Sequence, residues 1–310
     1  MVEYFPTNEV EFDRRFCSEE ACLEYLFQFR WPEGFVCTKC KHIGYWKSAR
    51  GLYVCCQCEH QQSVTAGTIF HSTKKPLTLW FKTMWWFSTR KDGVSAVSVQ
   101  EQLGLGSYQT AWRWLQKLRT CTIFPDREKL SGNVETDEIF IGGERSGKRG
   151  RGAEHKCKVA IAVERKGNKL GRVRMQVIDH CGADELIPFA KDSIAPGSII
   201  TTDGWKGYCG LEKAGFVHNK ILVNKVDEKD KDSVLSGVNI IASLVKRVIL
   251  GTFQGRFDKQ YLQRLLDEYV FRFNRRTTKT LGKRFWRIMQ RAVVSPPVTI
   301  SNLVLASTGV

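Results

Sequence analysis

The sequence predicts a multidomain α+β protein in which small cysteine-rich and helical modules precede a mixed α/β domain. Six of the eleven cysteines crowd between Cys22 and Cys58, and residues 35–63 are too poor in apolar residues to fold without a metal staple. Residues 77–119 have the periodicity of helices, whereas the chain from residue 134 onward alternates short β-branched runs with helical segments. A length of 310 residues leaves room for about two domains and accessory pieces.

The charge of the chain favours a polyanionic partner. The sequence holds 48 Lys and Arg against 32 Asp and Glu, a formal net charge of +16. Such an excess favours nucleic acid over an acidic small molecule. No apolar run approaches the roughly 20 residues that a membrane span needs, and the N-terminus lacks a basic-then-apolar signal pattern. We therefore expect no membrane partner and a cytoplasmic location.

The N-terminal part is predicted to be a short helical support, residues 1–34, followed by a zinc ribbon, residues 35–72. Two CxxC pairs with fourteen residues between them can close a thiolate tetrahedron around Zn²⁺. Chance clustering of buried cysteines is the alternative, and it is disfavoured because this segment has no core of its own. Cys56 is treated as a spare. The predicted zinc ligands are Cys37, Cys40, Cys55 and Cys58.

Residues 77–121 are predicted to hold a helix-turn-helix unit. A helix over 95–103 ends at a glycine-bearing turn, and Ser107 can cap the next helix, which runs to about residue 119. An apolar stripe falls at helical spacing, on Ala111, Trp114, Leu115 and Leu118. The opposite face, expected to meet DNA, carries Gln109, Arg113, Gln116 and Lys117. A solvated amphipathic helix without a DNA partner fits the same pattern.

Residues 133–291 are predicted to form the α/β domain, with a tail over 292–310. Asp137 lies in an alternating strand, where Glu138 competes with it for the inward position and Glu135 shares its face. Asp203 directly follows an apolar strand, a place where acids often bind cations, although a single Asp there is more often a turn former. Asn239 and Lys246 are two helical turns apart and project from one face of a helix over 234–250.

The surrounding motifs add a resemblance to a known family. Thirty-five residues separate Asp203 from Asn239, and Lys246 follows at plus seven, which resembles the D,D(35)E pattern of transposases and integrases. From about Phe16 to Arg291 the chain resembles bacterial zinc-ribbon insertion-sequence transposases of the ISXO type, related to Merlin elements, some of which carry Asn as the third ligand. The matching segments include CTKC at 37–40, TAGTIFH at 65–71, ETDE at 135–138, IGG at 141–143, TDGW at 202–205, KR at 246–247 and FRFNRR at 271–276.

The resemblance implies an RNase H-like catalytic domain that cuts DNA and joins its 3′-OH to target DNA. It implies that Asp137 on the first strand, Asp203 after the fourth and Asn239 on a later helix hold two Mg²⁺ or Mn²⁺ ions. Lys246 would then bind phosphate as a point charge. The implied partners are the terminal repeats of the element and the target DNA, bound by a homo-oligomer.

Basic segments outside this site are expected to contact DNA. A glycine-rich loop after the first strand carries Lys148, Arg149 and Arg151, together with Arg145, Lys156 and Lys158. From residue 269 to the end there are eight Lys or Arg and no acid. The residues of that segment expected at DNA are Arg272, Arg275 and Arg276. A solvated loop and a membrane-binding tail are the respective alternatives.

Two other functions remain open from the sequence. One is a catalytically weak or inactive DNA-binding protein that uses only the ribbon and the helix-turn-helix, and the other is a nuclease that cleaves without joining. Relatives often place His and Asn just before the third ligand and Trp three residues after it, whereas Ser236-Gly237-Val238 precede Asn239 here and Ala242 follows. Glu228 or Asp232 would be the displaced acid if Asn239 is not the ligand.

Overall fold

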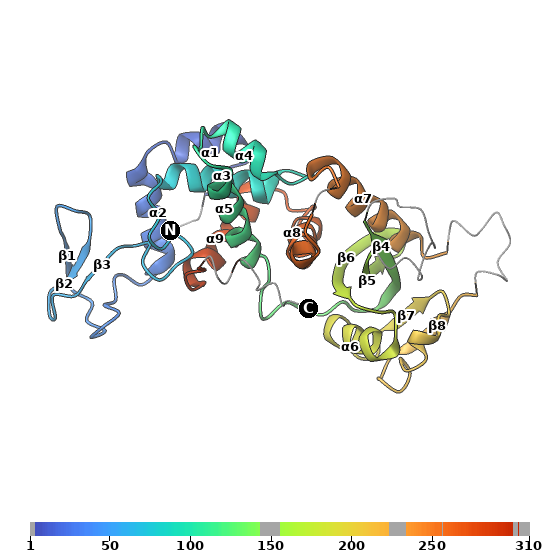
Figure 1. Ribbon diagram of the computed structural model, residues 1–310. Helices are drawn as coiled ribbons and strands as arrows, with labels where there is room; N and C mark the ends of the chain where they lie inside the picture. The colour runs from blue at the N-terminus through green and yellow to red at the C-terminus, as the bar shows by residue number, and fades with distance from the viewer. Residues whose placement is uncertain (1–3, 143–155, 223–233, 256, 300–302, 304–310) are drawn as a thin grey trace, which may run out of the picture. The chain divides into compact units, whose positions relative to one another are not determined.

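The computed structural model describes residues 4–142, 156–222, 234–255, 257–299 and 303 (Figure 1). The chain divides into two compact units. Unit 1 comprises Met1–Phe124 and Thr277–Val310, and unit 2 comprises Pro125–Arg276. The sequence had placed residues 277–291 in the α/β domain, whereas this division assigns them to unit 1.

Unit 1 is mostly helical and carries a small antiparallel sheet of order β1-β2-β3. Its described elements are α1 (Glu9–Arg15), α2 (Glu19–Arg30), β1 (Tyr45–Lys47), β2 (Tyr53–Cys55), β3 (Gln61–Gln62), α3 (Leu77–Thr89), α4 (Ala96–Gln102), α5 (Tyr108–Thr120) and α9 (Leu281–Val294). Ser18 begins α2 by accepting a hydrogen bond from the Ala21 amide, as its Ser-Glu-Glu sequence predicts. Ser107 precedes α5 without a capping bond from its side chain.

An aromatic core explains why α9 belongs to unit 1. Phe285 of α9 lies 5.2 Å from Phe12 and 5.5 Å from Phe16, centroid to centroid. Its ring also lies 5.6 Å from Phe81 of α3 and 6.2 Å from Tyr25 of α2. Aromatic rings at these separations attract each other beyond the burial of their area, so α9 completes the core formed by the first three helices.

Unit 2 is a five-stranded mixed sheet of order β6-β5-β4-β7-β8. Its elements are β4 (Asn133–Ile141), β5 (Cys157–Lys166), β6 (Lys169–Ile178), α6 (Ala183–Ser193), β7 (Ile199–Thr202), η2 (Lys206–Tyr208), β8 (Val217–Lys220), α7 (Ser236–Thr252), η5 (Lys259–Tyr261) and α8 (Leu262–Asn274). The β4, β5 and β6 strands pair antiparallel, whereas β7 runs parallel to both β4 and β8.

Helices cover both faces of this sheet (Figure 1). Val134 of β4 packs with α6 and η2 on one face. Ile139 and Ile141 of the same strand pack with α7 and α8 on the other. Because strand side chains alternate, Asp137 shares the α7 face with Ile139, while Glu138 points toward α6. The side chains of the neighbouring residues Asp137 and Glu138 therefore lie on opposite faces of the sheet.

Candidate functional site

The pairing of β4 with β7 brings Asp137 and Asp203 to the same level of the sheet. Glu135 pairs with Thr201 in the parallel ladder. If this register is continued two residues beyond its last pair, Asp137 falls level with Asp203, which directly follows the end of β7. Neighbouring strands lie about 4.8 Å apart. The two carboxylates therefore emerge from adjacent strands on one face, at the carboxyl end of a parallel pair.

A tight turn fixes the Asp203 side chain. Asp203 Oδ1 accepts a hydrogen bond of 2.9 Å from the Trp205 amide. Gly204 has a φ of +81°, which favours glycine, and its amide donates to Thr202 Oγ1 over 3.2 Å. The Trp205 indole nitrogen donates to the Cys181 carbonyl oxygen over 2.7 Å. These hydrogen bonds hold the turn on both sides of Asp203 and fix the orientation of its carboxylate.

Tyr208 is a further residue near these acids, and no sequence pattern singles it out. The residue is fully buried in η2. Burial raises the pKa of its phenol well above the usual range, and the carboxylates of Glu138, Asp137 and Asp203 raise that pKa further. The phenol therefore lies within electrostatic reach of all three acids. Glu138, the predicted competitor of Asp137, is buried in this group.

The α7 helix brings Asn239 over the same face of the sheet. The Val238 amide donates to Glu135 Oε2 over 3.1 Å, which fixes the start of the helix on β4. Asn239 is exposed, and its Nδ2 donates to the Val234 carbonyl oxygen over 3.1 Å. The amide oxygen Oδ1 is then the polar atom of this side chain that remains for a cation. Lys246 is exposed on the same helix.

The donor set suits a hard divalent cation. Carboxylate and amide oxygens are the ligands that Mg²⁺ and Mn²⁺ prefer. Asp137, Asp203 and Asn239 supply two charges and one neutral oxygen. The proposed displaced acids Glu228 and Asp232 lie outside the described residues.

The four predicted cysteines of the ribbon come together in unit 1. Their sulfur atoms all lie within 4.8 Å of one another, and they form the one such group of His, Cys, Asp or Glu ligands in the described chain. Cys37 Sγ lies 3.7 Å from Cys58 Sγ, and Cys40 Sγ lies 3.5 Å from Cys55 Sγ. A zinc ion bound at about 2.3 Å by four thiolates requires sulfur separations of about 3.8 Å. The cluster therefore fits a structural zinc ion.

Backbone amides prepare one of these thiols for a metal. The hydrogen bond from the Cys40 amide, with a second from the Lys39 amide, lowers the pKa of the Cys37 thiol to about 6, against the opposing effect of burial. Zinc binds the thiolate form of cysteine. These amides therefore favour the thiolate of Cys37. At Cys40 the His42 amide acts in the same direction, but burial and hydrogen bonds with the other three thiols raise the pKa of that thiol.

The helix-turn-helix prediction needs a correction on its outward face. Gln109 is exposed and Arg113 is half-buried, but Gln116 is only 2% exposed. Lys117 donates to the Ile69 carbonyl oxygen over 3.1 Å, and burial lowers the pKa of its ammonium group. Neither Gln116 nor Lys117 is free to enter a DNA groove. The reason is that α5 is in contact with the rest of unit 1 along a wider part of its surface than its apolar stripe predicts.

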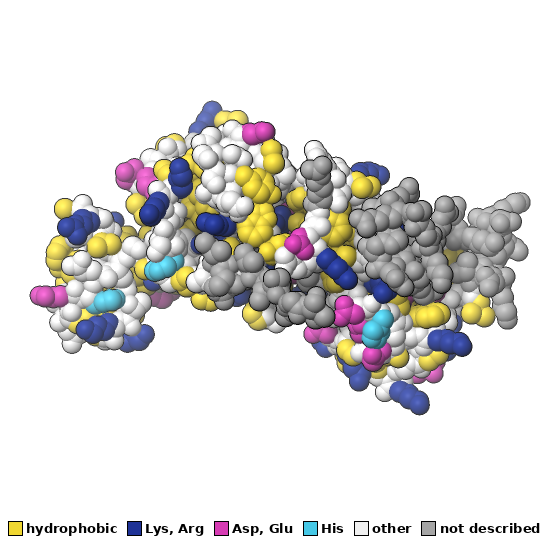
Figure 2. Space-filling view, viewed as in Figure 1, with side chains coloured by type: hydrophobic (Ala, Val, Ile, Leu, Met, Phe, Trp, Pro, Cys, Tyr) yellow, Lys and Arg dark blue, Asp and Glu magenta, His cyan; other side chains and the backbone are white. Residues whose placement is uncertain are grey.

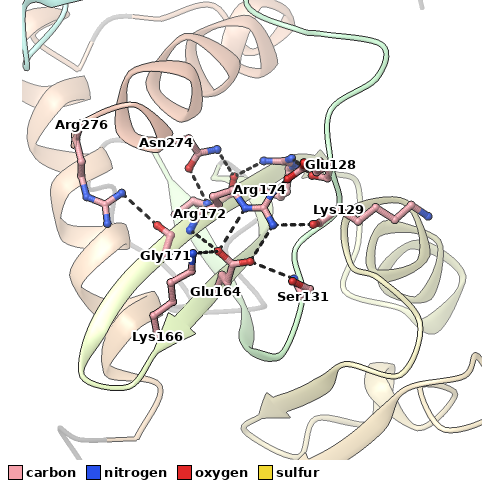
Figure 3. Close-up of polar contacts among 11 residues, drawn as sticks. Glu128, Lys129, Ser131, Glu164, Lys166, Gly171, Arg172, Arg174, Asn274 and Arg276 are labelled. Carbon is pink, nitrogen blue, oxygen red and sulfur yellow. Dashed lines mark hydrogen bonds and ion pairs between the residues drawn. The ribbon is translucent and has the colours of Figure 1, made fainter. Parts of the chain in front are cut away.

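The basic residues at the end of α8 are also placed differently from the prediction. Arg272 is 5% exposed and forms an ion pair with Glu268 one helical turn earlier. Arg275 is half-buried over the Phe271 ring, 4.2 Å from its centroid. Arg276 is exposed, stacks on Phe273 and donates to the carbonyl oxygen of Gly171 (Figure 3). Arg272 is therefore a structural residue of unit 2.

The remaining basic predictions fall partly outside the described residues. Lys148, Arg149 and Arg151 belong to the segment that the structure leaves undescribed. On the face shown in Figure 2, Lys and Arg side chains are spread over both units without forming one continuous patch. Within the described residues, every helix is too short or too polar to cross a membrane.

Comparisons with known proteins agree with the motifs. The model of the ISXO2-like transposase domain matches residues 129–274, and that of the transposase zinc-ribbon domain matches residues 17–61. An uncharacterized protein in transposable element ISH50 of Halobacterium salinarum is 25% identical over 221 residues, which cover 64% of this chain and 72% of that protein.

A solved structure with a weaker likeness is the cryoEM structure of the simian T-cell lymphotropic virus intasome in complex with PP2A regulatory subunit B56 gamma. The identity is 12% and the TM-score 0.29, and the match covers 56% of this chain and 63% of that one.

Proposed function

We propose, from the premise that this chain belongs to the ISXO2-like transposases with a zinc-ribbon domain, that it cleaves phosphodiester bonds at the ends of a DNA element and joins the freed 3′-OH to target DNA. The observation that carries this proposal is the register of β4 and β7, which sets Asp137 level with Asp203 on the face covered by α7. The strand order, three antiparallel strands followed by two parallel ones, supports an RNase H-like domain.

In this proposal Asp137, Asp203 and Asn239 hold two Mg²⁺ or Mn²⁺ ions. Such a pair of cations supplies a lowered pKa for the attacking water or hydroxyl and neutralises charge on the leaving oxygen. The Asp203 turn presents its carboxylate in a fixed direction, so little ordering is needed when a cation binds. Lys246 lies two turns along α7 from Asn239, where its ammonium group can bind a phosphate of the scissile strand.

The DNA partner is proposed to contact several separate surfaces. Gln109 and Arg113 at the start of α5 are the helix-turn-helix residues that retain exposure toward a groove. Arg275 and Arg276 remain candidates for phosphate contacts, and so do the basic residues of the undescribed loop. The cysteine cluster is proposed to hold a zinc ion that staples the ribbon. Joining two element ends requires them to be held together, so we propose that the chain acts as a homo-oligomer on DNA.

A strand-transfer assay tests this function. Purified protein is incubated with Mg²⁺ or Mn²⁺ and DNA fragments that carry the two ends of the element next to this gene, and cleaved and joined products are counted. We expect metal-dependent products from the wild type and roughly a hundredfold fewer from Asp203→Asn, because loss of an anionic ligand weakens binding of the cations that would neutralise charge on the leaving oxygen. Asp192→Asn, a change of the same kind at an exposed acid of α6, is the matched control.

The outcomes separate the candidate functions. A wild type that yields no metal-dependent product contradicts the enzyme proposal, and cleaved DNA without joined DNA favours the nuclease. Full activity of Asn239→Ala would move the third ligand to another residue.

A DNA-binding protein with weak catalysis is the second candidate, and one observation favours it. The amide of Asn239 contributes no charge, so only two carboxylates attract the cations. Asn239→Glu restores a third charge. If the neutral ligand limits cation binding, this variant will reach half-maximal activity at a lower Mg²⁺ concentration than the wild type.

A further inference from the structure

The first turn of α7 has no capping residue of its own. Leu235 occupies the N-cap position with a φ of 51°, and its side chain cannot accept a hydrogen bond. The first amides of a helix have no partner within the helix and need acceptors from elsewhere. Glu135 of β4 supplies one, because its Oε2 accepts from the Val238 amide over 3.1 Å. A strand residue more than a hundred positions earlier therefore caps the helix.

Glu135 is held in this position by two further features. Its Oε1 lies 3.4 Å from Nε of Arg165 on β5, and the two side chains are only 14% and 19% exposed. Gly237 lets the helix approach, since a Cβ at that position would meet Glu135 Oε2 at 2.7 Å and Arg165 Nη1 at 2.9 Å. Each carboxylate oxygen thus has its own partner, one on the neighbouring strand and one on the helix.

This contact lies between the proposed metal ligands. Glu135 precedes Asp137 by two residues, so both side chains are on the same face of β4. Val238 directly precedes Asn239. The hydrogen bond from Val238 to Glu135 therefore ties the residue next to the third ligand to the strand that carries the first one. The position of Asn239 relative to β4 follows from where this bond places the start of the helix.

We propose that Glu135 is a positioning residue, which sets the distance of Asn239 from Asp137 and Asp203 and thereby the affinity of the site for divalent cations. This inference rests on the proposed function. Residues that orient metal ligands typically change metal affinity or activity by 10–100-fold when they are replaced. Glu135 caps the helix as an anion at the positive end of its dipole, so both its charge and its acceptor oxygen contribute.

Glu164 offers a matched control in the same sheet (Figure 3). It is a glutamate on β5 with a 3% exposed side chain and an ion pair of 2.9 Å to Arg172. Glu164 also accepts from the amides of Ser131 and Arg172, each over 3.2 Å. These contacts hold the segment that enters unit 2, and none of them involves α7. Loss of Glu164 should therefore lower stability without altering the metal site.

The experiment compares Glu135→Ala and Glu135→Gln with Glu164→Ala and Glu164→Gln in the full chain. Mn²⁺ affinity is measured by titration, and the Asp203→Asn variant defines which part of the binding belongs to the site. Hydrogen exchange of peptides over 234–245 reports the Val238 amide independently of activity. We expect Glu135→Ala to weaken Mn²⁺ binding by 10–100-fold and to speed exchange at the start of α7. Glu135→Gln, which keeps an acceptor oxygen, should recover part of both.

The Glu164 variants should bind Mn²⁺ as the wild type does, and Glu164→Gln provides the comparison if Glu164→Ala does not fold. Wild-type affinity in Glu135→Ala, or an equal loss in the Glu164 variants, overturns the positioning role. If the wild type binds no Mn²⁺, or binds only Mn²⁺ that the Asp203→Asn variant also binds, the proposed function itself is contradicted. In that case unchanged exchange in Glu135→Ala would separately overturn the capping contact.

Discussion

Asp137 and Glu138 are adjacent acids that the strand assigns to different environments. Asp137 faces α7 and accepts a 2.8 Å hydrogen bond from the Glu138 amide. Glu138 is buried toward Tyr208, whose phenol stays protonated because burial and the surrounding carboxylates raise its pKa. A protonated phenol beside buried carboxylates can donate to one of them. Of the two acids, Asp137 is therefore the one that we propose as a cation ligand, and Glu138 lies in the buried layer on the other face of the sheet.

Gly237→Ala tests the approach of α7 at the scale of a single methyl group. Alanine normally stabilises a helix by up to about 1 kcal/mol relative to glycine. At Gly237 the new Cβ would meet the Glu135 carboxylate at 2.7 Å and displace it. We expect weaker Mn²⁺ binding, by about tenfold, and no gain in stability, as measured by titration and thermal unfolding.

The same helix offers the control for this prediction. At Gly251 an added Cβ meets nothing within 4 Å. Gly251→Ala should therefore raise stability and leave Mn²⁺ binding unchanged. Equal behaviour of the two variants would show that the close approach at Gly237 has no bearing on the metal site.

Sequence spacing was enough to nominate Asp137, Asp203 and Asn239, but not the residues that hold them. Glu135 was noted only for sharing a face with Asp137, because its partner Val238 lies 103 residues away. Tyr208 gave no signal, since a buried tyrosine after a strand has no distinctive pattern. Such contacts depend on which strands become neighbours, and a single sequence does not specify that.

The α8 helix shows how much charge an element can bury when each group has a partner. Glu268 and Arg272, one turn apart, are 1% and 5% exposed and form an ion pair. Asp267 beside them is buried, and its Oδ1 accepts from Gln263 Nε2 over 3.1 Å. A neutral amide compensates a buried carboxylate less well than a cation does. The two acids of α8 should therefore respond differently to pH.

Asp267 should make the stability of unit 2 decrease as the pH rises. Burial raises its pKa from 3.8 to about 6, against the lowering effects of Gln263 and Arg127. Because the folded state binds the proton more tightly than the unfolded state, this group favours folding below about pH 4, and that contribution is lost as the pH rises through 6. Asp267→Asn keeps the acceptor for Gln263 and should be more stable than the wild type at pH 7.5, by on the order of 2 kcal/mol.

The measurement for this prediction is urea-dependent hydrogen exchange of unit 2 peptides at pH 7.5 and pH 4.5. The advantage of Asp267→Asn should shrink at the lower pH, where the wild-type carboxyl group is protonated. Asp179→Asn, at an exposed acid of the same unit, is the control. If the stability difference between Asp267→Asn and the wild type is the same at both pH values, burial does not raise the pKa of the Asp267 carboxyl group.

Elements with strong periodicity were predictable, and short polar ones were not. The helix α7 begins and ends within two residues of its predicted bounds, 234–250. The edge strand β8, Val217–Lys220, was missed because it has four residues that are mostly polar and exposed. Its structure comes from pairing with β7, which is a property of the sheet. The outward face of α5 was wrong at Gln116 for a related reason, since burial by non-neighbouring segments leaves no mark on helical spacing.

At the scale of the molecule, unit 2 is inserted into unit 1. Both ends of the insertion are anchored to β6 (Figure 3). Near the start, Arg172 donates to the Lys129 carbonyl oxygen over 2.9 Å. Near the end, Asn274 Oδ1 accepts from the Val173 amide over 2.8 Å, and its Nδ2 donates to the Val173 carbonyl oxygen over 3.1 Å. The points where the chain enters and leaves unit 2 are therefore fixed on neighbouring residues of one strand.

The return of the chain to unit 1 makes a prediction for truncation after Arg276. If unit 1 were formed by one contiguous segment before unit 2, it would stay folded after this truncation. Instead, the truncation removes α9 and with it Phe285, Ile288 and Met289, which are at most 1% exposed. Loss of one buried phenylalanine side chain typically costs about 3–5 kcal/mol, so removing the whole face exceeds the stability of a small domain. We expect peptides from α1, α2 and α3 to lose hydrogen-exchange protection, while peptides from β4 and β5 keep theirs.

Two point variants in the full chain make this prediction specific to the core. Phe285→Ala should weaken protection in unit 1 in the same direction as the truncation. Arg287→Ala, on the partly exposed side of α9, should leave that protection unchanged, because it removes no part of the aromatic cluster. If α3 exchanges as slowly in the truncated chain as in the full one, α9 does not complete the core. Unit 1 would then fold from residues 4–124 alone, as a contiguous domain does.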